Sequence, residues 1–372
     1  MNVDEIINLA ASGVQRLKPY APGKPIGELQ REYGITDIVK LASNENPLGI
    51  SPKAKKAIES AINSVNLYPD GSAFELKNTL SEYLGFEQKQ ITIGNGSNDL
   101  LEIIARSFAD HSSEIIYSQH AFAVYYIVTQ ALGAKHVMTP AKEWGHDLTA
   151  MADAVTDETK IIFIANPNNP TGTYLPANAL KAFLHNVPEN IIVVLDEAYH
   201  EYIDKPDYGS ALQWVNEYSN LIVTRTFSKA YGLAGLRIGY SVSHPAVSDV
   251  LNRVRQPFNA NSLALVAAQA SINDEQFVKD TVALNNFGMQ QMTDAFIQMG
   301  LSYIPSVGNF VAVDVKNSGS VCYEALLHEG VIVRPVGPYQ MPHHLRVSIG
   351  TEAQNQKFIH ALEKVLSAKG VL

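Results

Sequence analysis

The sequence has very little cysteine: Cys322 is the only one among 372 residues. A single thiol cannot form an intramolecular disulfide, and it has no companion with which to build a thiolate metal site. The eleven histidines are scattered, and the adjacent pair His343 and His344 has no neighbouring carboxylates, so no metal site is predicted. This composition fits a protein of the reducing cytoplasm.

The sequence also lacks a hydrophobic run long enough to cross a membrane. Asp4 and Glu5 stand where a signal peptide would carry positive charge. A formal net charge of -9 argues against a broad nucleic-acid surface. Because 46% of the residues are hydrophobic and 17% are charged, we expect a soluble enzyme with small-molecule substrates and neither membrane nor nucleic-acid partners.

Strand and helix patterns alternate through the middle of the chain. Short apolar runs such as IIFIA and IIVVL, separated by amphipathic stretches, are typical of a sheet that is buried on both faces. We therefore predict an α/β fold, in which a mostly parallel sheet is flanked by helices and ligands collect at the carboxyl ends of the strands. The predicted strands are 91–93, 113–117, 135–138, 160–165, 190–196, 220–227 and 237–242.

The chain is long for one compact core, so we expect two domains. Residues 1–40 should form a helix (3–17) and a proline-rich arm, 41–272 the large domain, and 273–372 a smaller α+β domain built together with the N-terminal arm. A long helix at 275–299 should bridge the two domains. The small domain should contain strands 309–314, 331–335 and 345–349 and helices 320–328 and 352–367.

The stretch TRTFSKAYGLAGLR, residues 224–237, suggests a binding site for a phosphorylated aldehyde. Lys229 is a nucleophile for an aldehyde if its pKa is lowered. Thr226, Ser228 and Arg237 suit a phosphate dianion, so pyridoxal phosphate is the predicted cofactor. The alternative is a surface lysine beside an arginine in a structural ion pair.

GNGSND, residues 94–99, follows a predicted strand and precedes a helix expected to begin near Leu100. Gly96 allows close backbone approach, and the N–H groups of Ser97 and Asn98 suit a phosphate at a helix N-terminus. The alternative is a glycine turn that caps its own helix. Asp99 stands where a nicotinamide-binding motif has its third glycine, which argues against that fold.

Other polar or aromatic residues follow the remaining strands. Phe122 can stack on a planar ring, although a core position is the commoner role. Asn169 lies in the rigid loop ANPNNPTG and should be a fixed donor. Asp196 ends the most hydrophobic strand, where it can pair with a protonated pyridine nitrogen or simply cap a turn. Tyr199 can reach the phenolic oxygen of the same ring.

The ordered motifs NPNNPTG, LDEAY and TFSKAYGLAGLR resemble the fold type I aminotransferases, which use pyridoxal phosphate. PYAPGKPI, SNENPLG, NLYPDG, GNGSND, VIVRPV and LRVSIGT extend the resemblance along the whole chain to the histidinol-phosphate aminotransferase branch. Two departures exist: Asn98 and Asp99 stand where aspartate and glutamate are expected, and the turn before Phe122 lacks the usual Pro-Thr.

The resemblance implies transamination between histidinol phosphate and 2-oxoglutarate, in histidine biosynthesis. Arg334 and Arg346 interrupt apolar strands and should face an anion, although structural salt bridges are the alternative. By resemblance, Arg346 binds the carboxylate or phosphate of the substrate and Arg334 assists it. Tyr20 would close over the imidazole end or only anchor the arm. Tyr68 would reach the cofactor of a neighbouring subunit, which implies a homodimer with shared active sites.

Other functions fit the same residues less fully. An aromatic amino acid aminotransferase or a threonine-phosphate decarboxylase would share the cofactor site and differ around the arginines and the arm. A non-enzymatic nucleotide-binding protein would explain GNGSND, but it would leave Asp196, Lys229 and Arg237 without a common purpose.

Overall fold

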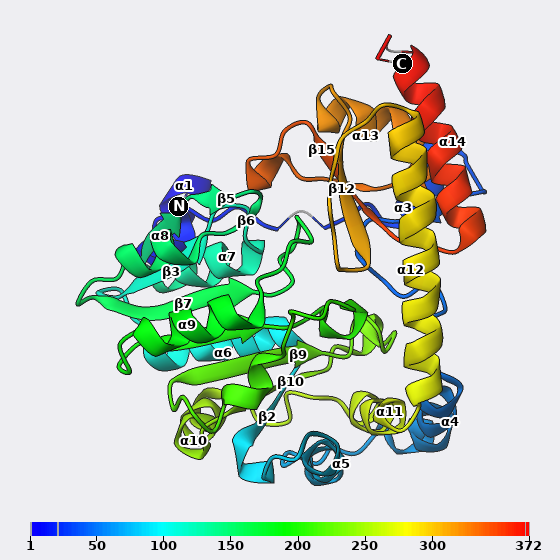
Figure 1. Ribbon diagram of the computed structural model, residues 1–372. Coiled ribbons are helices and arrows are strands. Elements are labelled where there is room, and N and C mark those ends of the chain that lie inside the picture. The colour runs from blue at the N-terminus through cyan, green and yellow to red at the C-terminus, as the bar shows by residue number, and fades with distance from the viewer. Residues whose placement is uncertain (1, 21, 369, 372) are drawn as a thin grey trace.

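The structure is a computed structural model that describes residues 2–20, 22–368 and 370–371. Figure 1 shows two units, each built around its own sheet, with the long helix α12 (Glu275–Gln298) running from one to the other. Its 24 residues span about 36 Å at 1.5 Å per residue. The predicted bridging helix is therefore confirmed.

The large unit contains a seven-stranded sheet in the order β2-β10-β9-β8-β7-β3-β4. β10 runs antiparallel to both of its neighbours, and the other pairs are parallel. All seven predicted strands are present. Their bounds are β2 Ile91–Gly94, β3 Glu114–Ser118, β4 Lys135–Thr139, β7 Thr159–Ala165, β8 Ile192–Asp196, β9 Leu221–Thr226 and β10 Gly239–Ser243. A short hairpin, β5 (Ala141–Lys142) and β6 (Gly145–His146), follows β4.

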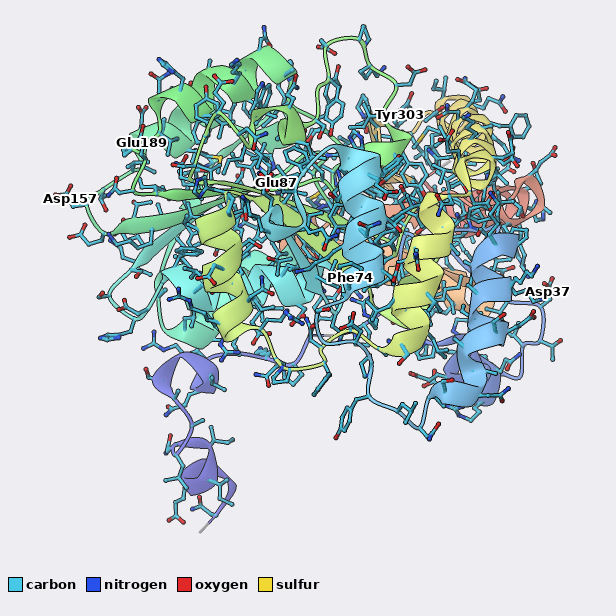
Figure 2. The ribbon with its side chains drawn as sticks, turned by 90° about the horizontal axis from the view of Figure 1, so that it is seen from below. Asp37, Phe74, Glu87, Asp157, Glu189 and Tyr303 are labelled. Carbon is cyan, nitrogen blue, oxygen red and sulfur yellow. The ribbon has the colours of Figure 1, made fainter. Side chains whose placement is uncertain are left out.

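Helices cover both faces of this sheet. Successive strand side chains point to opposite faces, so Ile161 and Ile162 belong to different core clusters, and both are fully buried. Three helices pack on the Ile161 face: α6 (Ser97–Phe108), α7 (Ala123–Leu132) and α10 (Pro245–Val254). Five pack on the other: α4 (Pro52–Ala61), α5 (Phe74–Leu84), α8 (Leu148–Asp153), α9 (Ala177–Asn186) and α11 (Ser262–Ile272). Figure 2 shows α5, α11 and α4 side by side.

The small unit has an antiparallel sheet in the order β11-β12-β15-β14. Its elements are β11 (Tyr303–Ile304), β12 (Phe310–Asp314), β14 (Arg334–Pro335), β15 (His344–Ser348), α13 (Gly319–His328) and α14 (Glu352–Ala368). The expected single strand 331–335 is wrong in one respect, because the chain changes partner within it. Its first part, β13 (Val331–Ile332), pairs with β1 (Val39–Lys40), and its second part, β14, pairs with β15.

The N-terminal region departs most from expectation. The predicted helix 3–17 is wrong: two short helices, α1 (Val3–Ile7) and α2 (Ser12–Gln15), take its place. Gly13 lies so close to α7 that a Cβ there would be 2.1 Å from the carbonyl oxygen of Gln130. Leu9 and Val14 are exposed, so these apolar residues are not buried in a core of the described chain. Figure 2 shows α2 against the body of the molecule and α1 projecting beyond it.

The arm after α2 is extended, as predicted, but the helix α3 (Ile26–Tyr33) that follows it was not expected. Its Leu29 is fully buried in a small cluster with Leu327 and Ile332. This packing fastens the N-terminal arm to the small unit. None of the helices in the described ranges is long and apolar enough to cross a membrane.

Candidate active site

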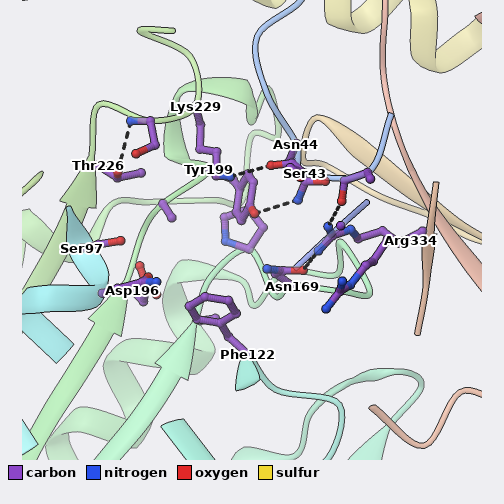
Figure 3. A pocket seen from close by; sticks show the side chains of 18 of the residues that line it. Ser43, Asn44, Ser97, Phe122, Asn169, Asp196, Tyr199, Thr226, Lys229 and Arg334 are labelled. Carbon is purple, nitrogen blue, oxygen red and sulfur yellow. Dashed lines mark hydrogen bonds between the residues drawn. The ribbon is translucent and has the colours of Figure 1, made fainter. Parts of the chain in front are cut away.

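A cavity of about 190 Å³ lies at the carboxyl ends of β7, β8 and β9, where the large unit faces the small unit and the arm. Figure 3 shows Asp196 and Phe122 on one wall and Arg334 on another, with Lys229 and Tyr199 above them. The predicted site residues that line the cavity are Tyr20, Ser97, Asn98, Phe122, Asn169, Asp196, Tyr199, Thr226, Ser228, Lys229, Arg237, Arg334 and Arg346. Residues predicted from separate motifs thus meet at one place.

Lys229 follows β9 in a tight turn and points into the cavity. Burial, assisted by the positive charges of Arg346 and Arg237, lowers its pKa to about 7 despite the opposing effect of Glu45. Its Nζ donates to the backbone oxygen of Ser43 at 3.1 Å and lies 5.7 Å from the centre of the Tyr199 ring. At neutral pH a large fraction of this amine is therefore uncharged and nucleophilic.

Asp196 is the last residue of β8 and is buried. Tyr125 OH donates to its Oδ2 at 3.1 Å, and Thr224 Oγ1 donates to its Oδ1 at 3.2 Å. Burial raises the pKa of this carboxyl to about 6, although both hydrogen bonds act in the opposite direction. Tyr125 itself is held by parallel stacking on Phe163, with ring centroids 4.7 Å apart. The carboxylate is thus fixed from behind and faces the cavity.

Tyr125 was missed at the sequence level. It lies one helical turn after Phe122 on α7, and its ring has no exposed surface. Its apolar neighbours gave it the pattern of a core tyrosine. Only the position of its hydroxyl next to β8, which depends on tertiary packing, assigns it to the site.

Small residues and hydroxyls form a tight cradle beside Arg237. A Cβ on Gly96 would be 2.4 Å from Arg237 Nη2, and a Cβ on Gly239 would be 2.7 Å from the backbone N of Ser97. Arg237 Nη1 donates to Ser228 Oγ at 3.2 Å, and the Ser228 N–H donates to Thr226 Oγ1 at 3.1 Å. Only glycine fits this close approach.

The helix behind the cradle begins earlier than expected. α6 starts at Ser97 and not near Leu100, because Gly96 takes a left-handed φ of 84° and acts as its N-cap. The N-terminal N–H groups of the helix therefore face the cavity. The Asn98 side chain is exposed, while Asp99 accepts hydrogen bonds from the Asn95 backbone and from Asn259, both at 2.8 Å. Asp99 is thus held in a structural role.

Two arginines of the small unit reach the opposite wall. Arg346 on β15 is buried; it donates to Asn169 Oδ1 at 2.6 Å and to the Ala42 oxygen at 2.7 Å. Its Nε has no partner among the described residues. Arg334 on β14 lies 5.3 Å from the centre of the half-exposed Tyr20 ring. Neither contact is a salt bridge, so both guanidinium groups keep donors for an anion.

The stretch LASNEN, residues 41–46, crosses between the units and lines the cavity at Ala42, Ser43 and Asn44. We call residues 41–46 the crossing segment. Asn46 Nδ2 donates to the oxygen of Ala230 and to Thr281 on α12. The segment therefore touches both cavity walls and the bridging helix. The motif SNENPLG was the available signal, but it could not show these long-range contacts.

Phe122 is the N-cap residue of α7, and its ring meets Tyr125 edge to face at 6.0 Å. Tyr68 lies elsewhere: it is 83% exposed and stacks on Phe258 with ring centroids 4.9 Å apart. The structure therefore brings Phe122 to the cavity but leaves Tyr68 on the outer surface of this chain.

The architecture is that of the fold type I aminotransferases. A crystal structure of histidinol-phosphate aminotransferase from Sinorhizobium meliloti in complex with pyridoxal-5'-phosphate superimposes with a TM-score of 0.88, at 29% identity, covering 96% of this chain and 97% of the other. Aspartate aminotransferase from Thermus thermophilus shares the fold, with a TM-score of 0.83, 20% identity and coverage of 95% and 99%.

The family model "aminotransferase class I and II" matches residues 36–362. Histidinol-phosphate aminotransferase 1 of Idiomarina loihiensis is 56% identical over 98% of both chains. Histidinol-phosphate aminotransferase 2 of Pseudomonas fluorescens is 55% identical over 96% of this chain and 98% of its own. The chain belongs to the class I and II aminotransferase family.

Proposed function

We propose that this protein binds pyridoxal phosphate in the cavity and transfers an amino group between histidinol phosphate and 2-oxoglutarate, forming imidazole-acetol phosphate and glutamate. The observation that carries the proposal is the convergence, in one cavity, of an amine with a pKa of about 7, a carboxylate at the end of a strand and a hydroxyl-and-arginine cradle. Because Gly96 and Gly239 carry no Cβ beside the cradle, a phosphate can be accommodated at the N-terminus of α6.

When bound, pyridoxal phosphate supplies an aldehyde for the amine and a ring that accepts electrons from the substrate carbon. Lys229 would hold the aldehyde, and once the incoming substrate amine has released it, its free uncharged amine would be placed to accept the proton from that carbon and return it. Asp196, ionised above about pH 6, can hold a protonated ring nitrogen. Such a cation would lower the pKa of the Asp196 carboxyl again, so the carboxylate and the protonated nitrogen would stabilise each other's charge.

The remaining residues would hold and orient the cofactor. Thr226, Ser228 and Arg237 supply hydroxyls and a guanidinium to a phosphate, together with the N–H groups of Ser97 and Asn98. Phe122 offers a flat face to the ring. Tyr199 and Asn169 both line the cavity and would bind the phenolic oxygen of the ring.

Arg346 and Arg334 suit both substrates. Histidinol phosphate and an oxo acid each place an anion at a distance from the reacting carbon, and a guanidinium binds phosphate and carboxylate by the same fork of donors. Arg346 lines the cavity, and its hydrogen bonds to Asn169 and Ala42 use one N–H of each terminal nitrogen, which leaves one N–H on each for an anion. The relatives described above carry the name histidinol-phosphate aminotransferase, and nothing in the comparisons favours the decarboxylase or the non-enzymatic alternative.

The test is kcat/KM for histidinol phosphate against phenylalanine, tyrosine and threonine phosphate, each with 2-oxoglutarate. Histidinol phosphate should be the best of the four, with the aromatic amino acids slower. If another donor is preferred, the aminotransferase activity stands but the substrate is wrong. Release of carbon dioxide from threonine phosphate would support the decarboxylase.

We also propose a cytoplasmic homodimer whose two sites are shared. Tyr68 projects from the turn after α4 together with exposed Leu67, and Phe258 and Phe74 nearby are also largely exposed. Such an apolar patch fits burial against a second copy of the chain. The single cysteine, Cys322, is buried, which suits a reducing compartment.

Complementation tests the shared site. Lys229→Ala and Tyr68→Ala are each expected to be impaired, and mixed dimers would hold one intact site. Unfolding and refolding the two variants together should restore about a quarter of wild-type activity. A wild-type protein that is fully active as a monomer, or a mixture that recovers nothing, would contradict the proposal.

A further inference from the structure

Asn44, in the crossing segment, is buried and uses every polar atom that it has. Its backbone N–H donates to Ser348 Oγ at 2.7 Å, and its backbone oxygen accepts from Asn309 Nδ2 at 3.0 Å. Its side-chain Oδ1 accepts from Ser348 Oγ at 3.0 Å, while Nδ2 donates to Tyr199 OH at 2.8 Å. Asn44 therefore connects two residues of the small unit to one residue of the large unit.

These contacts fix which way the amide points. Ser348 Oγ accepts the Asn44 N–H and donates its own proton to Asn44 Oδ1. That bond places the amide oxygen on the Ser348 side and the amide NH₂ on the Tyr199 side. A left-handed backbone conformation, with φ 55° at Asn44, is one that asparagine tolerates better than most residues.

The orientation of the Asn44 amide determines the direction of the Tyr199 hydroxyl proton. Because its oxygen accepts the Asn44 amide, its single proton is left to be donated elsewhere, and Tyr199 lines the cavity. Ser348 does not line the cavity; it stands behind Asn44, two residues after Arg346 on β15. Residues two apart on a strand share a face, so the serine and the proposed anion-binding arginine project from the small unit together.

We propose that Ser348 and Asn44 are positioning residues, which aim the Tyr199 hydroxyl proton into the cavity and make its direction depend on the placement of the small unit. This inference rests on the proposed function, because the acceptor in the cavity would be an oxygen of the bound cofactor or substrate. The Asn44 bond also acts on the acidity of the phenol: burial raises the Tyr199 pKa to about 12, and this hydrogen bond limits the rise.

The test is a double-mutant cycle with Ser348→Ala and Tyr199→Phe. Ser348→Ala should lower kcat by about 3- to 10-fold, the value of one hydrogen bond, and change KM less than about twofold. In the Tyr199→Phe background the same substitution should have almost no further effect, since residues acting through one group are not additive. An equal loss of kcat in both backgrounds would show that Ser348 does not act through Tyr199, and Ser348 would then be a structural residue.

A spectroscopic readout accompanies the kinetics. The pH midpoint of the visible absorbance of the cofactor-loaded protein should move in the same direction in Ser348→Ala as in Tyr199→Phe. The matched control is Ser241→Ala: Ser241 is also buried in a strand, on β10, but its hydroxyl has no partner among the described residues. A midpoint that moves equally in the control, or not at all in Ser348→Ala, would contradict the proposal.

Asn44→Asp is the second variant, should Ser348→Ala fail to fold. It keeps the size of the side chain but replaces the donor facing Tyr199 by an acceptor, which draws the phenol proton away from the cavity. Its loss in kcat should approach that of Tyr199→Phe, and wild-type kcat in Asn44→Asp would overturn the inference. A wild-type protein that binds no pyridoxal phosphate would instead remove the proposed function itself.

Discussion

The two walls of the cavity hold their polar groups in different ways. On the wall of the large unit, Asp196, Thr226 and Lys229 lie at or just past the ends of neighbouring strands, so the sheet places them directly. On the opposite wall, Arg346 and Asn44 are held by contacts between distant parts of the sequence: 304 positions separate Arg346 from Ala42, and 304 separate Asn44 from Ser348. The first wall is set by local chain geometry, and the second by how the small unit and the crossing segment dock.

This difference separates two tasks. A cofactor that stays bound needs anchors on a rigid scaffold, and the strand ends provide them. Two substrates that alternate at one site need anion-binding groups that can serve both, and the arginines of the small unit provide these. Substitutions on the first wall should therefore remove the chemistry, while substitutions of the two arginines on the second wall should change affinity and selectivity.

The largest effect is expected at the amine. Lys229→Ala should abolish turnover, because no other lysine among the described residues lines the cavity, while histidinol phosphate and cofactor can still bind through the phosphate cradle and the arginines. Steady-state assay and equilibrium binding measure the two separately. Substantial turnover by this variant would mean that the large-unit wall does not hold the reacting amine.

Asp196→Asn should follow, lowering kcat by about three orders of magnitude while the fold persists. The amide keeps the shape of the carboxylate but cannot stabilise a protonated ring nitrogen. The thermal midpoint should remain near that of the wild type, because the substitution removes a carboxylate whose burial is itself unfavourable. Near-normal kcat in Asp196→Asn would refute the role assigned to this residue.

On the second wall, Arg346→Ala should lower kcat/KM for both histidinol phosphate and glutamate by roughly a hundredfold, the value of a charge-assisted hydrogen bond or two. Arg334→Ala should cost less, because Arg334 is only partly buried. Arg106→Ala, on the exposed side of α6, is the matched control. If Arg346→Ala lowered only kcat and left KM unchanged for both substrates, Arg346 would take part in the chemical step and not in substrate binding. The proposed difference between the two walls would then be wrong.

The same contrast explains what the sequence could predict. The seven strands and the cavity residues of the large unit were predicted because strand periodicity and short motifs are local signals. Asn44, Tyr125 and the division of 331–335 between two sheets were missed, because each depends on which distant segment docks against it. The helix predicted over 3–17 failed for a related reason: periodicity is a local signal, and in the structure Ile6, Ile7, Leu9 and Val14 are exposed.

A smaller effect concerns pH. The Lys229 pKa of about 7 lies below its ordinary value of 10.5, so the unfolded chain binds more protons and the stability of the cofactor-free protein rises with pH between about 7 and 10.5. Lys229→Met should therefore raise the thermal midpoint by a few degrees at pH 6 and by much less at pH 10. Lys55→Met, exposed on α4, should show no such dependence; equal shifts at both pH values in Lys229→Met would refute the buried charge.

The smallest effect is expected at the arm. Tyr20→Phe keeps the ring beside Arg334 and removes only the hydroxyl, so kcat/KM should fall by about two- to fivefold for histidinol phosphate and not for glutamate. Tyr20→Ala should extend the loss because the contact with Arg334 disappears. Equal effects on both substrates would make Tyr20 an anchor of the arm and not a selectivity residue.

Every proposed step depends on Lys229 as the attachment point of the cofactor, and one measurement tests this directly. The loaded protein is reduced with borohydride and digested, and its peptides are mapped by mass spectrometry. Pyridoxal phosphate should be fixed to the peptide containing Lys229, and the label should be lost in Lys229→Ala. Fixation to any other lysine, in a protein that still transaminates, would contradict this assignment.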